Sequence, residues 1–211
     1  MNLSKQLILL SVFFIFSCDY AGSFQPKVTQ VKKVIAPQKP MTILIQPFND
    51  LPKEYLDFVS AELKKVYPYI KINPSINQPK NTKNQAKTRY RADALIKYLR
   101  NQTPDGYKTI GLTTSDISTT MGNHADWGVI GLGFRPGKSS IVSSFRLKGA
   151  NSKEKLFRSA VHELGHNYGL PHCPVEACLM KDAKGKDIFN KVQDFCKNCK
   201  QTLVKAGWTL K

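Results

Sequence analysis

The residues with the clearest chemical meaning form the run His-Glu-Leu-Gly-His-Asn-Tyr-Gly-Leu-Pro-His at positions 162–172. His162 and His166 are four residues apart, so on a helix they lie one turn apart on the same face. Gly169 can adopt the positive φ that ends a helix and reverses the chain, which would bring His172 toward the other two histidines. Three neutral imidazoles that leave a fourth position for water are typical of a catalytic zinc site.

Glu163 directly follows the first of these histidines, and its carboxylate is placed to accept a proton from water at the metal. A single histidine on an amphipathic helix is usually a packing or surface residue. Here three of the chain's four histidines fall within eleven residues at ligand spacing. The glycine and the third histidine are also in register. The pattern therefore predicts a catalytic zinc site with Glu163 as general base.

A second group of potential ligands follows the histidines. Cys173 and Cys178 are five residues apart, and Cys196 and Cys199 form a C-x-x-C pair. Four thiolates in two pairs match a closed tetrahedral zinc site, which stabilises a fold rather than performing chemistry. Two disulfides are an alternative for an exported protein, and a redox-active C-x-x-C pair is a third. The spacing favours zinc, because a disulfide within C-x-x-C strains its loop.

The segment from residue 162 to residue 199 resembles the archaemetzincin family of the metzincin zinc proteases. The extended histidine motif is followed, as in that family, by cysteines, a methionine and a C-x-x-C pair, although only fifteen residues separate Met180 from Cys196. The resemblance implies a zinc metallopeptidase with two zinc ions and a peptide or protein substrate. The implied site residues are the zinc ligands His162, His166 and His172, the base Glu163, the methionine turn Met180, and a structural zinc on Cys173, Cys178, Cys196 and Cys199.

Two functions are compatible with such a chain. The first is hydrolysis of peptide bonds by a water molecule that Glu163 activates, with endopeptidase and aminopeptidase action both open. The second is a non-catalytic, zinc-stabilised binding protein at the cell surface. A binding module needs no general base, whereas Glu163 stands beside the ligands. The enzyme is therefore the favoured hypothesis.

The N-terminus is predicted to be a targeting segment. Lys5 precedes an apolar run, Leu7 to Phe16, that is too short to span a bilayer comfortably. The run ends at Ser17-Cys18, which resembles a bacterial lipoprotein signal. That resemblance implies a lipid on Cys18, as the first residue of an exported, membrane-anchored chain on the periplasmic or cell-surface side. An ordinary secretory signal and an uncleaved anchor are the alternatives.

Composition divides the remaining chain into a tether and one domain. Residues 19–40 mix Gly, Ser, Gln, Pro and Lys without apolar periodicity, which is typical of a flexible tether. Residues 41–211 have the length and apolar content of one zinc protease domain. The net charge of +17 favours anionic partners. However, the lysines are spread along the chain and no nucleic-acid motif is present, so we expect a solvated surface, no nucleic-acid partner and a monomer.

The order of predicted elements indicates the fold class. Strands are predicted at 41–48, 70–72, 107–113, 127–134 and 139–147, and helices at 52–67, 84–101, 153–170 and 192–208. This order predicts an α+β fold: a metzincin-like α/β sandwich with a mixed twisted sheet, an active-site helix and a small C-terminal subdomain. We expect the strand at 139–147 to present an open edge to substrate. Tyr168 and His124 are possible helpers that we expect to be structural.

Overall fold

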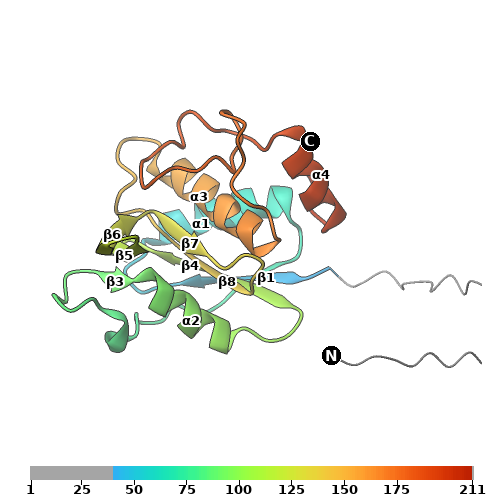
Figure 1. Cartoon of the computed structure of the whole chain (residues 1–211). Coiled ribbons are helices and arrows are strands. Elements are labelled where there is room, and N and C mark those ends of the chain that lie inside the picture. Colours follow the sequence, from blue (N-terminus) through green and yellow to red (C-terminus); the bar gives the residue numbers. More distant parts are fainter. Residues whose placement is uncertain (1–39, 211) are drawn as a thin grey trace, which may run out of the picture. The chain divides into compact units, whose positions relative to one another are not determined.

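The computed structural model describes residues 40–210 of the chain. The predicted signal segment, Cys18 and most of the predicted tether lie outside the described residues. The central element is a five-stranded sheet with the order β2-β1-β4-β8-β7 (Figure 1). All neighbouring strands are parallel except β7, which is antiparallel to β8. The strands are β1 (Thr42–Pro47), β2 (Ile70–Ile72), β4 (Tyr107–Thr113), β7 (Gly131–Gly133) and β8 (Ser139–Ser143).

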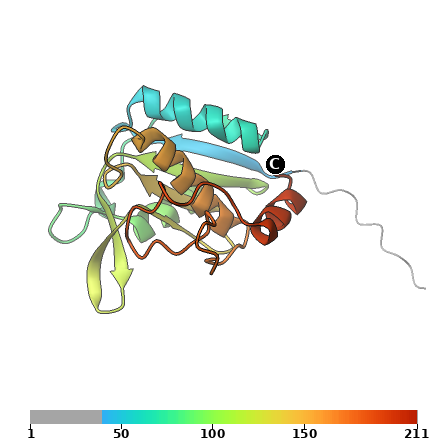
Figure 2. The same cartoon turned by 90° about the horizontal axis from the view of Figure 1, so that it is seen from above.

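Helices cover both faces of this sheet, as Figures 1 and 2 show. Helices α1 (Lys53–Val66) and α3 (Ser152–Asn167) share one apolar core with Ile43, Ile45 and Val142 of the sheet. Helix α2 (Ala92–Gln102) packs in a second core with Phe48 and Ile141. Successive residues of a strand point to opposite faces, so the adjacent residues of β8 serve different cores.

A smaller sheet lies beside the main one and contains a hairpin. It has the order β3-β5-β6, with β3 at Tyr90–Arg91, β5 at Ile117–Met121 and β6 at His124–Val129. Gly122 has a φ of 56° at the hairpin turn, a conformation that glycine adopts without strain. The other short element of this region is a 3₁₀ turn at Lys80–Thr82. The chain after α3 is largely irregular and ends in α4 (Lys197–Lys205).

The predicted fold class is confirmed: the sheet is mixed, helices lie on both faces, and the C-terminal part is small and irregular. Most predicted elements are present: β2 and β4 have the predicted bounds, and most of the others are shorter than predicted. The predicted helix at 84–101 begins only at Ala92, because Asn84 forms a turn by accepting hydrogen bonds from the backbone N–H groups of Thr88 and Arg89. The predicted strand at 127–134 is two strands that belong to different sheets, and β5 was not predicted.

The prediction of an open edge at residues 139–147 was wrong. This strand ends at Ser143 and is paired on both sides, with β4 and with β7. The chain folds back at 134–138, so β7 becomes the edge of the sheet. The predicted helix at 192–208 is also shorter, because Asp194 pairs with Cys178 and its carbonyl accepts a hydrogen bond from Leu179 N. Among residues 40–210, no helix has the length and apolar character needed to cross a membrane.

Candidate metal centres and active site

Helix α3 holds the first two histidines in a buried position. His162 Nδ1 donates to the carbonyl of Leu179 at 2.6 Å, and His166 Nδ1 donates to the carbonyl of Leu170 at 2.7 Å. Because Nδ1 carries the proton, each Nε2 keeps a free lone pair for a metal. Burial, aided by the neighbouring His166, lowers the pKa of His162 to about 3, and burial also lowers the pKa of His166. Both rings are therefore neutral near pH 7, as metal ligands must be.

The turn after α3 brings in the third histidine. Gly169 has a φ of 96°, and Leu170 N donates to the carbonyl of Gly165 to close the end of the helix. The ring of His172 then lies 4.8 Å from that of His166 and 5.6 Å from that of His162, between centroids. One nitrogen from each ring lies within 4.8 Å of the others. Three neutral nitrogen donors that converge in this way fit a zinc ion.

Glu163 lies beside this group and is almost fully buried, with 7% of its surface exposed. Burial raises the pKa of its carboxyl group to about 8. Edge strand β7 leaves room for it: a Cβ on Gly131 would lie 2.6 Å from Glu163 Oε1, and a Cβ on Gly133 would lie 3.0 Å from the Glu163 carbonyl oxygen. The two glycines therefore let the strand pass directly over the carboxylate.

Met180 is fully buried and packs against helix α3 at Gly165. A Cβ on Gly165 would lie 2.6 Å from Met180 Sδ, so the glycine inside the histidine motif lets the methionine approach α3. The same segment makes two further contacts with the site, because the Leu179 carbonyl accepts from His162 and the Met180 carbonyl accepts from Cys173 N. Met180 and its neighbour Leu179 therefore connect the segment after His172 to helix α3.

The four cysteines form a second cluster. The sulfur atoms of Cys173, Cys178, Cys196 and Cys199 lie within 4.8 Å of one another. All four are free thiols, and the Sγ atoms of Cys173 and Cys196 are 3.7 Å apart. That distance is far from a disulfide bond of about 2.0 Å. It is close to the edge of about 3.8 Å expected for a tetrahedron with Zn–S distances of about 2.3 Å. The donor set therefore fits zinc better than two disulfides.

One cysteine of this cluster, Cys196, has a thiol with a lowered pKa. Cys196 is the N-cap residue of α4, and a hydrogen bond from the backbone of Cys199 is the main factor that lowers the pKa of its thiol to about 7. A helix N-terminus stabilises a thiolate in this way. Burial instead raises the pKa values of Cys178 and Cys199. A bound cation would favour the thiolate form of these two cysteines, which burial alone disfavours. This agrees with a metal site.

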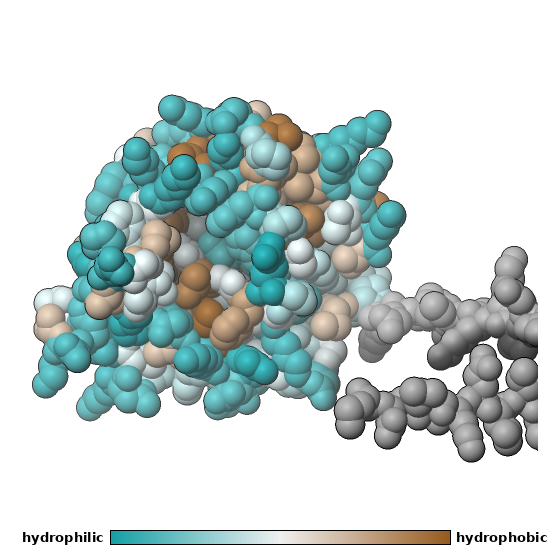
Figure 3. All heavy atoms as spheres, viewed as in Figure 1, coloured by the Kyte–Doolittle hydropathy of each residue, from teal (hydrophilic) through white to brown (hydrophobic). Residues whose placement is uncertain are grey.

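A cleft of about 550 Å³ opens over the histidines and Glu163. Figure 3 shows a hollow in the face that Figure 1 presents, with apolar surface inside it and mostly hydrophilic surface around it. The cleft is lined by α3, by β7, by the β5–β6 hairpin and by the segment at 182–189. Ser159 is one of its buried lining residues, and its hydroxyl makes no hydrogen bond within residues 40–210. The cleft is large enough for several residues of a peptide.

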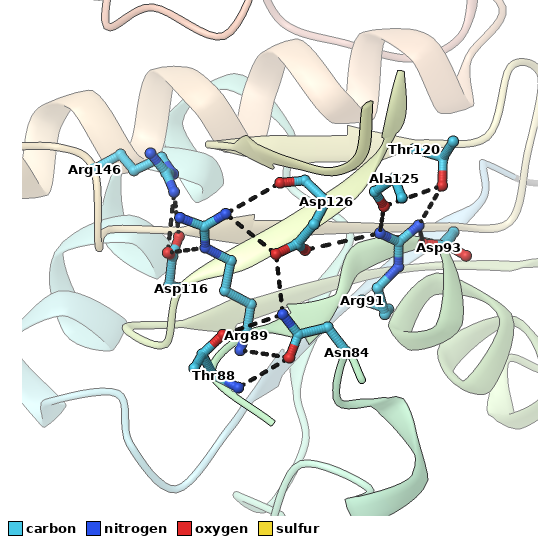
Figure 4. Close-up of polar contacts among 10 residues, drawn as sticks. All are labelled: Asn84, Thr88, Arg89, Arg91, Asp93, Asp116, Thr120, Ala125, Asp126 and Arg146. Carbon is cyan, nitrogen blue, oxygen red and sulfur yellow. Dashed lines mark hydrogen bonds and ion pairs between the residues drawn. The ribbon is translucent and has the colours of Figure 1, made fainter. Parts of the chain in front are cut away.

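A network of ion pairs and hydrogen bonds fastens the β5–β6 hairpin (Figure 4). The carboxylate of Asp116 accepts from Arg89 Nε at 2.7 Å and pairs with Arg146 Nη2 at 2.8 Å. Arg89 also reaches Asp126 on β6, at 3.3 Å. These contacts fasten β5 and β6 to the 84–91 loop. Thr119 and Met121 of the hairpin line the cleft.

Sequence reasoning missed several residues that support the site. Asn167 is buried beside His166, and its Nδ2 donates to the carbonyls of Phe134 and Ser139, both at 2.9 Å. Lys108 Nζ donates to the carbonyls of Gly137 and Asn167, and burial lowers its pKa. These contacts fix the end of α3 to the loop between β7 and β8. Asn167 lies within the motif, but nothing in the sequence marks Lys108.

Asp182 is a further residue that the sequence did not single out. Its Oδ2 is 3.9 Å from His172 Nδ1 at the rim of the cleft. The two possible helpers, in contrast, have structural positions. Tyr168 packs with Tyr67 and Trp208, and the ring of His124 lies 5.4 Å from that of Trp127. Neither Tyr168 nor His124 lines the cleft.

Known proteins share this fold and motif. The model of peptidase family M54 matches residues 28–205. An archaemetzincin from Haloquadratum walsbyi is 28% identical over 177 residues, which cover 77% of this chain and 99% of the relative. The crystal structure of archaemetzincin from Archaeoglobus fulgidus, complexed with malonate, has a TM-score of 0.66 at 26% identity and covers 77% of this chain and 99% of that one. The archaemetzincin structure from Methanopyrus kandleri has a TM-score of 0.68 at 24% identity, with coverage of 82% and 98%, and shows the shared fold.

A mixed sheet, an active-site helix with three convergent histidines, and these relatives define a zinc metallopeptidase. The chain belongs to peptidase family M54.

Proposed function

We propose that the chain hydrolyses peptide bonds in the cleft above α3, with His162, His166 and His172 as ligands of one zinc ion and Glu163 as general base. The observation that carries this proposal is the convergence of the three histidine nitrogens, within 4.8 Å of one another, beside the buried carboxylate of Glu163. The cleft over them is open to solvent through the exposed His172.

The chemistry divides between the metal and the chain. Zinc, when bound by the three histidines, supplies a Lewis acid that activates water and polarises the scissile carbonyl. Glu163 takes the proton of the attacking water on its carboxylate and passes it to the leaving amine. Burial raises the pKa of Glu163 to about 8, and a nearby cation acts in the opposite direction. The carboxylate can therefore hold and release a proton near neutral pH.

The substrate we propose is an extended peptide that lies along β7. Within residues 40–210, β7 pairs with β8 alone and its other side faces the cleft. A peptide can add there as a further strand through backbone hydrogen bonds. Because Gly131 and Gly133 have no side chain on the face toward Glu163, a substrate paired with β7 would lie close to that carboxylate.

A second zinc ion is proposed for the cysteine cluster, where it would have a structural role. The cluster joins the segment after His172 to the start of α4. Between these points lie Leu179 and Met180, which support the histidines. A metal on Cys173, Cys178, Cys196 and Cys199 would therefore stabilise the floor of the active site.

We further propose that Cys18 carries a lipid and that the domain acts at a membrane outside the cytoplasm. The support is the apolar run that ends at Ser17-Cys18. Expression in a bacterial host with a labelled fatty acid tests this proposal. The label is expected on the parent chain and not on Cys18→Ala. Equal labelling of both chains would contradict it.

The variant Glu163→Gln tests the proposed mechanism, because it keeps the size of the side chain and removes its ability to accept a proton. We expect a loss of about 10²–10⁴-fold in kcat with an unchanged zinc content. The assay is cleavage of a peptide library with free and with blocked N-termini, which also separates aminopeptidase from endopeptidase action. Glu154→Gln is the matched control, because Glu154 lies in the first turn of the same helix.

Three results decide between the candidate functions. Full turnover by Glu163→Gln would refute the general-base role. A zinc-loaded parent chain that binds peptides but cleaves none would favour the alternative, a non-catalytic binding protein. A loss in Glu154→Gln equal to that in Glu163→Gln would show that the effect comes from the stability of α3.

A further inference from the structure

The described domain begins at Pro40, which lies next to the C-terminal helix α4. A Cβ on Gly207, just after α4, would lie 3.8 Å from Cβ of Pro40, the first described residue. Tyr67 donates a hydrogen bond to the carbonyl of Met41, and Thr209 N donates to the carbonyl of Val66. Figures 1 and 2 both show α4 and the start of β1 at the same end of the domain. Any anchor that precedes residue 40 is therefore attached at this end.

The parallel sheet brings helix ends to the same place. Strands β1, β2, β4 and β8 are parallel neighbours, so all of them begin at this end. Helix α1 returns the chain to the start of β2, and α2 returns it to the start of β4. The C-terminal turns of both helices, and that of α4 beside Pro40, therefore meet where the chain joins the domain.

Basic side chains are grouped at the end where the chain enters the domain. The last turns of the helices are basic: Lys64 and Lys65 in α1, Arg100 in α2 and Lys205 in α4. The first turns of α1, α2 and α3 each contain one acidic residue, Glu54, Asp93 and Glu154, and those of α1 and α3 also contain Lys53 and Lys153. The basic residues of the last turns and the acidic residues of the first turns favour the helix dipoles and stabilise each helix by themselves. Lys65 is paired with Glu62, whereas Lys64 and Lys205 are exposed and add positive charge to this end of the domain.

Exposed apolar side chains lie among these charges. Tyr69 is 48% exposed and Val204 is 47% exposed. Tyr69 follows the end of α1 and packs against Tyr67, while Val204 lies on α4 and lines a shallow groove with Phe195 and Lys205. Aromatic and aliphatic groups mixed with lysines are typical of surfaces that contact the headgroup region of a bilayer.

We propose that this basic end, defined by Lys64, Tyr69, Lys71, Val204 and Lys205, lies against an anionic lipid surface. The inference deepens the proposed function, because it relies on Cys18 as the attachment point and adds the face that meets the membrane. A nucleic acid would also be attracted by the lysines, so binding to a DNA duplex is an outcome of the test. None of the five residues lines the cleft, so membrane contact leaves the active site open.

The test measures binding of a chain without lipid, residues 18–211 with Cys18→Ser, to phosphatidylcholine vesicles with and without phosphatidylglycerol. We expect binding to the anionic vesicles only, weakened by salt. The triple variant Lys64→Glu, Lys71→Glu and Lys205→Glu should bind on the order of a hundredfold more weakly, because each lysine near such a surface contributes substantially. All three side chains are exposed, so the melting temperature should be retained.

The matched control is the triple variant Lys53→Glu, Lys80→Glu and Lys148→Glu. It changes the net charge by the same amount, but its three substitutions lie at the opposite end of the domain. Lys53 is in the first turn of α1, Lys148 precedes α3, and Lys80 follows Gln78, which contacts the end of β4. This control should bind within a few-fold of the parent chain. Equal losses in the two variants, absence of binding by the parent, or tighter binding to a DNA duplex than to vesicles would each overturn the proposal.

The vesicle assay reads binding, whereas the proposed function is read by cleavage of a soluble peptide. Both triple variants should cleave that peptide at the parent rate. A parent chain without peptidase activity would contradict the proposed function, while the comparison of the two variants would still decide the membrane contact.

Discussion

At the scale of single residues, the position of the Glu163 carboxylate depends on the absence of side chains at two residues of β7. Glu163 is buried under β7, and the strand reaches it only because residues 131 and 133 are glycines. Any larger side chain at these positions would meet the carboxylate or its backbone. The pattern Gly-Leu-Gly in the edge strand is therefore part of the active site, although glycine itself performs no chemistry.

Gly131→Ala should lower kcat by roughly 10²-fold, because a Cβ only 2.6 Å from Glu163 Oε1 forces the carboxylate to move by about an ångström. Zinc content should be unchanged, since the atoms nearest to the added Cβ all belong to Glu163 and none to a histidine. Steady-state kinetics with metal analysis measures both. Leu132→Ala is the comparison on the same strand, because its side chain packs against the second core and lines the cleft, so it weakens β7 without a clash at Glu163. A Gly131→Ala enzyme with the parent kcat would show that Glu163 needs no fixed position.

The residues of this site differ in how well the sequence predicts them. The spacing of His162, His166 and Gly169 was informative because distance along a helix fixes distance in space. The partners Leu179 and Gly131 come from other elements, and no local pattern joins them to the motif. Their roles follow only from the packing of β7 and of the 173–196 segment on α3.

At the scale of elements, the active-site cleft depends on a hairpin that is held by ion pairs as well as by apolar packing. The hairpin of β5 and β6 is fastened through Asp116, whose side chain is 10% exposed, to Arg89 and Arg146, which are about one-third exposed. Gly128 lies directly under the Arg146 guanidinium, where a Cβ would come within 2.1 Å of it. The network therefore sets the position of Met121 and Thr119 over the cleft.

Asp116→Ala should destabilise the domain by about 2 kcal/mol, which is less than the roughly 3–5 kcal/mol of a fully buried pair because both arginines are partly solvated. It should also raise KM more than it lowers kcat, since the hairpin contacts substrate but not the reacting bond. Urea unfolding and steady-state kinetics measure these effects. Asp105→Ala, whose carboxylate is 96% exposed, should change neither. An unchanged KM for Asp116→Ala would show that the hairpin does not contribute to substrate binding.

Regular elements were easier to predict than their neighbours. The buried strands β1 and β4 and helix α1 have strong local patterns, and all three are present. Whether a strand is internal or at an edge depends on the pairing of distant segments, so the edge was assigned to residues 139–147 instead of β7. The polar hairpin strand β5 was missed because its partner contacts, and not its own hydrophobicity, make it a strand.

At the scale of the whole molecule, the two parts of the domain are stabilised differently. The part before α3 has two sheets and two apolar cores. The part after α3 contains one regular element, α4, within the described residues. Its free thiols converge on a point near Met180, so a metal would replace the regular hydrogen bonding that this segment lacks.

Two zinc ions per chain are therefore expected, with separable effects. His162→Ala should bind one zinc, lose activity and keep the melting temperature nearly unchanged. Cys199→Ser should also bind one zinc, but it should lower the melting temperature by several degrees, because metal binding at a structural site contributes to folding. It should lower activity as well, since the Leu179 carbonyl that orients His162 belongs to the segment that the cysteines hold. Metal analysis, calorimetry and a thiol titration of the unfolded chain measure these quantities. Fewer than four titratable thiols among the C-terminal cysteines would instead favour disulfides and would leave the histidine site as the single zinc site.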